Sequence, residues 1–185
     1  MLLAGCGAVT GTVHAMTTLR QGLLEGRAVA LAGGVSPTIG GALSALGARL
    51  DRQPVQALVY DAGPAFADGG QDRLRECLEQ AWVAVHDAAT GALIPTGASK
   101  VVLIGPRPDA GPFAAAARAA LENLARTLSV EWARYGVGTV AIVPGASTTD
   151  DEVAELVCFL VSPAGEYFTG CVFELGRAGD LIRSS

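Results

Sequence analysis

The sequence predicts an α/β protein built on one parallel sheet that helices cover on both faces. Three observations lead to this prediction: short apolar runs alternate with longer helix-like stretches, the runs are apolar almost throughout, and Gly and Pro stand at the joints. Strands that are buried on both faces have to be apolar at nearly every position. Regular alternation of strand and helix favours right-handed βαβ units and therefore a doubly wound parallel sheet.

The expected elements follow one another along the whole chain. Strands are expected at the apolar runs 1–4, 28–32, 57–60, 101–104, 139–143 and 171–175. Helices are expected at 12–25, 38–50, 70–90, 112–135 and 150–162. The joints contain GGVSP, DAGP, GPRPDAGP and PGAS, which are turn-forming compositions. A chain of 185 residues suits one hydrophobic core, so one domain spanning 1–185 is expected.

Composition excludes several classes of protein. Half of the residues are apolar and 17% are charged, as in globular proteins, and the net charge of -5 argues against a nucleic-acid partner. No apolar run approaches the roughly 20 residues that span a bilayer, so no membrane partner is expected. The four cysteines, Cys6, Cys77, Cys158 and Cys171, are scattered. We expect them to be small buried side chains in a reducing cytoplasm, without a metal or disulfide role.

The loop after the first expected strand is GCGAVTG, residues 5–11. A Gly-rich turn that opens a helix can hold a pyrophosphate on main-chain N–H groups. The alternative is that these glycines only form a tight strand-to-helix turn, and the motif by itself leaves both interpretations open.

Three later stretches together resemble the short-chain dehydrogenase/reductase family: ALVYDAG, ALENLARTLSVEWARYGVGTVAIVPG and DDEVAELVCFLVSPAGEYFTGCVFELG. They cover most of residues 55–179 in the family's order. The resemblance implies a Rossmann-like sheet of about six strands. The stretch AVALAGGVS is similar to the family's third strand, and no good second strand precedes it. One strand–helix unit of the nucleotide-binding half is therefore expected to be missing.

The residues that carry the family's chemistry are absent. The family uses a Tyr, a Lys four residues later, a Ser and an Asn. Aligning RAALENL on the family's pattern places Ala114 at the Tyr position and Arg118 at the Lys position, and Gly105-Pro106 replace the Ser. No Tyr-x-x-x-Lys occurs anywhere in the chain, and the only asparagine, Asn123, falls in the wrong helix. Since alanines offer no titratable group, no catalytic residue and no metal ligand are predicted.

The resemblance also implies cofactor-binding positions. These are Gly5, Val9 and Gly11 in the glycine motif, Ala62 and Gly63 after the strand at 57–60, Arg118, and Pro144 with Gly145. Val9 stands where the family has its middle glycine, and its side chain should obstruct a pyrophosphate. Asp61 would add negative charge near a polyanionic cofactor. No NAD(P) binding, or weak binding, is therefore expected, with no basis for choosing between NAD and NADP.

The helix at 112–135 keeps an apolar stripe of Leu121, Leu124, Leu128 and Trp132, which predicts core packing. Its other face is small and family-like, with Ala115, Ala116, Ala119, Glu122 and Arg126. In the family this helix and the preceding one pack against a neighbouring subunit, and the segment matching 168–175 forms a second contact. The hypothesis is a catalytically defective, non-catalytic subunit, in a homo-oligomer or with an active relative.

Two alternatives remain open at this stage. One is an active NAD(P)-dependent oxidoreductase with rearranged chemistry that uses His86, Asp61 or Asp87. The other is a nucleotide-binding sensor that keeps a crevice and performs no reaction.

Overall fold

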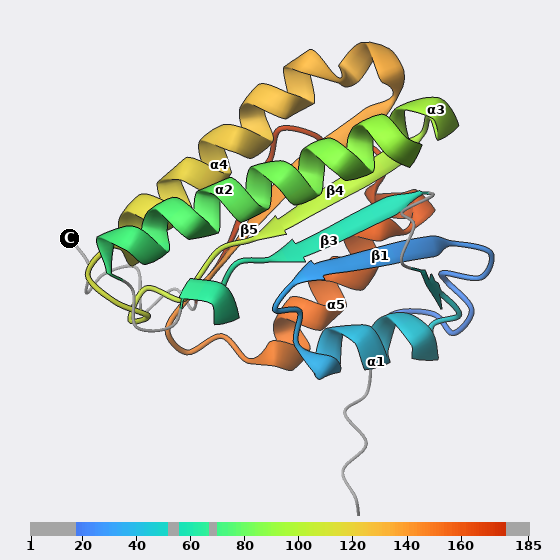
Figure 1. Cartoon of the computed structure of the whole chain (residues 1–185). Coiled ribbons are helices and arrows are strands. Elements are labelled where there is room, and N and C mark those ends of the chain that lie inside the picture. The colour runs from blue at the N-terminus through green and yellow to red at the C-terminus, as the bar shows by residue number, and fades with distance from the viewer. Residues whose placement is uncertain (1–17, 52–55, 67–69, 177–185) are drawn as a thin grey trace, which may run out of the picture.

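The computed structural model describes residues 18–51, 56–66 and 70–176. These residues form a sheet of six parallel strands in the order β2-β1-β3-β4-β5-β6 (Figure 1). The strands are β1 (Ala28–Gly33), β2 (Arg49–Leu50), β3 (Ala57–Asp61), β4 (Ser99–Ile104), β5 (Val137–Pro144) and β6 (Val172–Leu175). Every residue of β3 and β4 is buried, as the continuous apolar runs predict for central strands.

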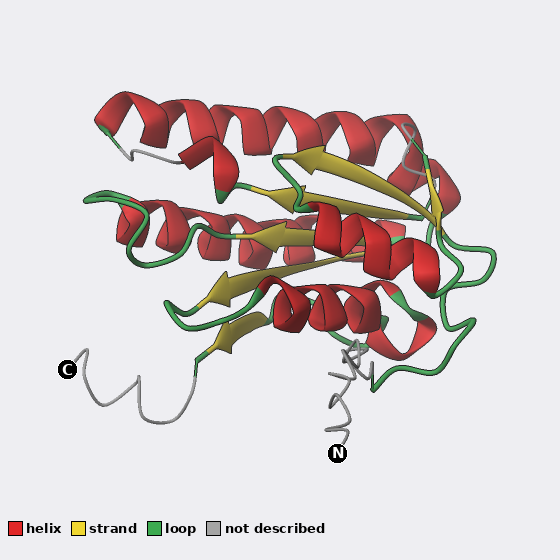
Figure 2. Cartoon of the chain, turned by 90° about the horizontal axis from the view of Figure 1, so that it is seen from below, coloured by secondary structure: helices red, strands yellow, loops and turns green. Residues whose placement is uncertain are grey.

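Helices cover both faces of the sheet (Figure 2), and every pairing between neighbouring strands is parallel. On one face lie α2 (Gln71–Ala88) and α4 (Ala114–Glu131), and on the other lie α1 (Pro37–Ala45) and α5 (Asp150–Val161). The chain leaves α2 through a π-helical turn (Ala89–Leu93) and the short α3 (Ile94–Thr96). Single 3₁₀ turns occupy Pro64–Phe66, Ala133–Tyr135 and Pro163–Gly165. The doubly wound α/β fold is confirmed.

Two expected helices differ from the structure. Residues 18–25 of the helix expected at 12–25 form turns, and residues 12–17 lie outside the described part, as does the strand expected at 1–4. The helix expected at 38–50 ends at Ala45. Gly47 adopts φ +97°, its N–H bonds to the carbonyl of Ser44, and the N–H of Ala48 bonds to that of Leu43. This Schellman motif stops the helix and frees Arg49–Leu50 to pair with β1.

The position of β1 corrects the assignment of AVALAGGVS to a third strand. In the usual doubly wound order the third strand lies at an edge, whereas β1 lies between β2 and β3. Leu50 and Ala57 both pair with Val29, so β2 ends at the same end of the sheet where β3 begins. Only residues 51–56 join them, too few for another strand and helix. Any strand–helix unit that the chain lacks would therefore belong between β2 and β3 and not before β1.

The core confirms the predicted stripe of α4. Leu121 and Leu128 are buried, and Leu124 and Trp132 pack against the same cluster. Cys77 and Cys158 are buried in the two halves of the core, while Cys171 is only half-buried and Cys6 lies outside the described residues. In the described part of the chain, none of the helices combines the length and the apolar character needed to cross a membrane.

Candidate functional site at the carboxyl ends of the strands

A cavity of about 470 Å³ lies at the carboxyl ends of the strands. The chain moves from β1 outward to β2 and then back to β3 on the other side of β1, so β1 and β3 flank the topological switch point, where doubly wound folds bind their ligands. The cavity has apolar walls and four charged side chains. It is lined by Ser36, Ile39, Asp61, Gly63, Pro64, Ile104, Gly105, Arg107, Asp109, Ala110, Pro144, Asp150 and Val153.

The loop from β1 to α1 reaches the cavity through Ser36, the N-cap of α1. The first turn of this helix has its main-chain donors engaged. Pro37 has no N–H, and the N–H of Thr38 donates to Ser36 Oγ at 3.3 Å. The N–H groups of Ile39 and Gly40 both donate to the carbonyl of Ser36. The N-terminus of α1 is therefore capped within its own chain.

Asp61 ends β3 and lines the cavity, with only 7% of the residue exposed. Its Oδ1 accepts a hydrogen bond of 2.8 Å from the N–H of Gly63. Burial raises the pKa of the Asp61 carboxyl from 3.8 to about 6, against the lowering effect of main-chain hydrogen bonds from Gly63 and Ser36; Asp150 raises it and Arg107 lowers it. Burial thus makes the Asp61 carboxyl easier to protonate than an ordinary aspartate.

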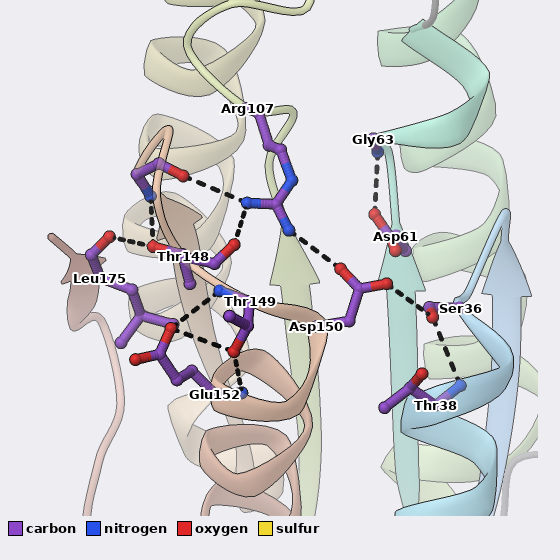
Figure 3. Close-up of polar contacts among 11 residues, drawn as sticks. Ser36, Thr38, Asp61, Gly63, Arg107, Thr148, Thr149, Asp150, Glu152 and Leu175 are labelled. Carbon is purple, nitrogen blue, oxygen red and sulfur yellow. Dashed lines mark hydrogen bonds and ion pairs between the residues drawn. The ribbon is translucent and has the colours of Figure 1, made fainter.

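Arg107, in the loop after β4, joins three segments at the cavity wall (Figure 3). Its Nη1 donates to the carbonyl oxygens of Gly145 and Thr148, and its Nη2 donates to Asp150 Oδ1 at 2.9 Å. The second oxygen of Asp150 accepts the hydroxyl hydrogen bond of Ser36 at 3.1 Å. This chain of contacts, Arg107–Asp150–Ser36, connects the beginnings of α5 and α1.

The first turn of α5 is also fixed by local hydrogen bonds. Thr149 is the N-cap of a capping box: its Oγ1 accepts from the N–H of Glu152, and its own N–H donates to Glu152 Oε2. Thr148 Oγ1 donates to the carbonyl of Leu175 at 2.5 Å and accepts from the N–H of Gly145. The segment that places Asp150 is therefore held by β5, β6 and its own helix, and the sequence-based assignment of Asp150 and Asp151 to a helix start is confirmed.

The helix that would carry the family's chemistry presents no reactive group to the cavity. Ala114, at the Tyr position, is fully buried in the first turn of α4. Arg118, one turn later, donates from Nη1 to the carbonyls of Pro106 at 2.9 Å and Pro144 at 2.6 Å. Burial lowers the pKa of the Arg118 guanidinium, with Glu122 and Glu174 acting in the opposite sense. Arg118 therefore ties the end of β4 to the end of β5.

The predicted cofactor positions divide into three groups. Gly63 and Pro144 line the cavity. Ala62 is buried and donates from its N–H to the carbonyl of Ile104, while Gly145 and Arg118 are engaged in the hydrogen bonds given above. Gly5, Val9 and Gly11 lie outside the described residues. The strand order places the loop 33–36 at the topological switch point. The sequence analysis had assigned this segment to a third strand.

Of the three alternative catalytic candidates, the structure brings one to the cavity and leaves two away from it. Asp61 lines the cavity, but His86 and Asp87 are exposed on α2 and do not line it. The His86 ring lies against Trp82 with 5.4 Å between ring centroids, and its Nδ1 lies 3.5 Å from Asp87 Oδ1. Sequence reasoning missed Ser36, Arg107 and Asp109 as site residues. Their positions in loops that follow β1 and β4 were the available signal.

No family model and no curated protein matches this chain, whereas many solved structures match its fold. A citronellol catabolism dehydrogenase from Pseudomonas aeruginosa superposes with a TM-score of 0.72 at 21% identity, over 89% of this chain and 99% of that one. A hydroxysteroid dehydrogenase from Escherichia coli gives 0.66 at 16%, over 84% and 97%. A short-chain dehydrogenase/reductase family oxidoreductase from Brucella ovis, in complex with a partially ordered NAD, gives 0.64 at 21%, over 81% and 99%. The chain has the six-stranded, Rossmann-like fold of short-chain dehydrogenase structures.

Proposed function

We propose that this protein is a catalytically defective short-chain dehydrogenase/reductase that acts as a non-catalytic subunit of an oligomer, formed with its own copies or with an active relative. The observation that supports this proposal most is that α4 presents no reactive side chain to the cavity. Ala114 is buried, and Arg118 donates to the carbonyls of Pro106 and Pro144. General acid–base catalysis needs a titratable group within reach of the substrate, and α4 supplies none to the cavity.

Weak or absent dinucleotide binding is part of this proposal. Pyrophosphates bind at the N-terminus of the helix after the switch-point strand, on free main-chain N–H groups. In α1 the donors of Thr38, Ile39 and Gly40 are engaged by Ser36, and the carboxylate of Asp150 contacts the Ser36 hydroxyl. A polyanion would have to displace these hydrogen bonds and approach that carboxylate. The described residues therefore fit NAD(P) poorly.

The outer surface of α2 and α4 supports the role of a subunit. These helices lie on the same face of the sheet (Figure 1). Trp82 and Val83 of α2 are 46% and 53% exposed, and Val130 of α4 is 76% exposed. Val130 continues the stripe Ala115, Ala119, Glu122 and Arg126 at helical spacing. Exposed apolar side chains beside small residues are typical of a helix–helix interface.

Two measurements test this proposal. Light scattering should give an oligomer that Ala119→Glu dissociates, whereas Ala45→Glu, an exposed alanine on α1 across the sheet, should leave it intact. Purified protein should not oxidise alcohols or reduce ketones with NAD or NADP. A wild-type monomer that also fails to bind a co-expressed active relative would refute the subunit role. Turnover that Asp61→Asn abolishes would instead favour the enzyme with rearranged chemistry.

A second candidate function, that of a small-molecule sensor, is favoured by the cavity itself. Its volume of about 470 Å³ falls within the range of ligand pockets, and no residue of α4 lines it. A non-catalytic subunit that kept a ligand crevice would combine both roles.

A further inference from the structure

The charges of the crevice do not balance. Three carboxylates, those of Asp61, Asp109 and Asp150, and one guanidinium, that of Arg107, line the cavity. Arg107 directs its hydrogen bonds to Gly145, Thr148 and Asp150. Both oxygens of Asp150 are engaged, by Arg107 and Ser36. The positive charge of Arg107 is therefore paired with Asp150 within the wall.

Because Arg107 is paired with Asp150, it does not serve as the ion-pair partner of Asp61, the buried carboxylate of the cavity. Among the ion pairs of the described residues, none includes Asp61. The main-chain N–H groups of Gly63 and Ser36 stabilise its charged form, and a carboxylate offers about four acceptor positions. Acceptor capacity therefore remains on Asp61, which lines the cavity. A buried charge without a counterion lowers stability, and such groups in clefts are frequent at functional sites.

The remaining walls are apolar. Three aliphatic side chains from three different elements line the cavity: Ile39, Ile104 and Val153. Pro64 and Ala110 also line it. A ligand that fits these walls has an apolar body, and a ligand that satisfies Asp61 carries a positive charge or strong hydrogen-bond donors.

We propose that this crevice binds a small organic cation, an ammonium on an apolar body, with the ammonium on Asp61 and the body against Ile39, Ile104 and Val153. The inference rests on the proposed non-catalytic function, since it assigns the crevice a ligand and no reaction. An ammonium supplies the missing counterion at Asp61. The same carboxylates repel phosphates and carboxylates, so the crevice selects against the polyanions that this fold usually binds.

Binding and protonation are coupled in this site. An ammonium binds the ionised form of Asp61, so occupation of the site lowers the pKa of that carboxyl from about 6. Below this pH the carboxyl is protonated and its attraction for the cation is lost. The other charged groups that line the cavity are Arg107, Asp109 and Asp150.

The experiment compares three probes of similar size by NMR titration of the full chain at pH 7.5: 2-phenylethylamine, 2-phenylethanol and 3-phenylpropanoate. The amine is expected to bind about tenfold more tightly than the alcohol, with shifts at Gly63 and Gly105, and the carboxylate is expected not to bind. Asp61→Asn should weaken amine binding about tenfold, whereas Asp109→Asn, on the exposed side of the lining, should change it less than about threefold.

The wild-type pH dependence requires no variant and keeps the test valid if Asp61→Asn does not fold. From pH 7.5 to 5 amine affinity should fall about tenfold, while alcohol affinity should stay constant. Three results would overturn the proposal: 3-phenylpropanoate binds as tightly as 2-phenylethylamine, none of the probes binds, or the affinity for the amine does not change with pH. None of these outcomes contradicts the proposed non-catalytic function. That function would be refuted by turnover or by the absence of an oligomer, whereas these outcomes concern only the class of ligand.

Discussion

Arg107 Nη2 donates to Asp150 Oδ1 at 2.9 Å, and this ion pair joins the loop after β4 to the first turn of α5. The two residues are 43 positions apart in the sequence. Because Asp150 also accepts from Ser36, the pair fixes three loops around the crevice.

The Arg107–Asp150 pair should show measurable coupling in a double-mutant cycle. With Arg107→Gln and Asp150→Asn, we expect a coupling free energy of about 0.5–1 kcal/mol in urea unfolding, since both side chains are partly exposed. Arg107→Gln alone should lower the free energy of unfolding more than Asp150→Asn alone, because Arg107 also donates hydrogen bonds to two carbonyl groups. The exposed Arg73–Glu76 pair of α2 is the control, with about 0.3 kcal/mol expected. Equal coupling in both pairs would contradict a special role for Arg107–Asp150.

Asp61 should make stability depend on pH between about 4 and 6. Its folded-state pKa of about 6 lies above the ordinary 3.8, so the folded state binds the proton more tightly. The stabilisation from protonation is complete below 3.8 and is lost as pH rises through 6. Asp61→Asn, which carries no charge, should therefore be more stable than wild type at pH 7.5, by roughly 1–3 kcal/mol, and the difference should shrink at pH 4.

Chemical denaturation at the two pH values measures the effect of Asp61→Asn. Asp109→Asn is the control, because Asp109 is exposed, and it should change the free energy of unfolding little at either pH. An Asp61→Asn variant that is less stable than wild type at pH 7.5 would show that the buried charge is compensated.

The first turn of α4, where the family resemblance would place a tyrosine, should not accommodate that side chain. Ala114 is fully buried, whereas its neighbour Ala115 is exposed. Ala114→Tyr should lower the free energy of unfolding by about 3 kcal/mol through overpacking, and Ala115→Tyr should change it by less than about 0.5 kcal/mol. The combination Ala114→Tyr with Arg118→Lys should show no NAD-dependent turnover. If it did, the remainder of the site would have to be competent for hydride transfer.

Lys100 should give the opposite pH dependence at the other end of the sheet. The Lys100 ammonium donates to the carbonyls of Gly165 and Phe168, and burial lowers its pKa from 10.5 to about 8, with Cys171 and Glu166 raising it. Between these pH values the unfolded chain binds more protons, so the contribution of Lys100 to stability rises as pH increases from 8 to 10.5. Relative to Lys100→Met, wild type should gain roughly 1–2 kcal/mol over this range.

The comparison of wild type with Lys100→Met cancels the other groups that titrate in this range. Burial raises the pKa of Tyr60 to about 12 and that of Cys158 to about 12 as well. Wild type and Lys100→Met both contain these groups, so a difference curve from thermal unfolding reports Lys100 together with its coupling to Cys171 and Glu166. A flat difference curve would show that the ammonium keeps its ordinary pKa.

The local sequence was sufficient for five of the six strands and for the helices α2, α4 and α5. The runs at 28–32, 57–60, 101–104, 139–143 and 171–175 are all strands of the sheet. Central strands need continuous apolarity, and a helix on a sheet needs an apolar stripe such as Leu121 and Leu128, so both leave a periodic signal. The absence of Tyr-x-x-x-Lys is likewise a property of the sequence alone.

Only the tertiary structure decided which loop forms the crevice and what surrounds it. Local periodicity carries no information on strand order, so β1 was matched to the family's third strand, and β2 is too short to leave a pattern. The Ser36–Asp150 contact spans 114 positions and Arg107–Asp150 spans 43. Such contacts form because parallel strands bring their carboxyl ends to one edge, which makes neighbours of loops that are distant in sequence.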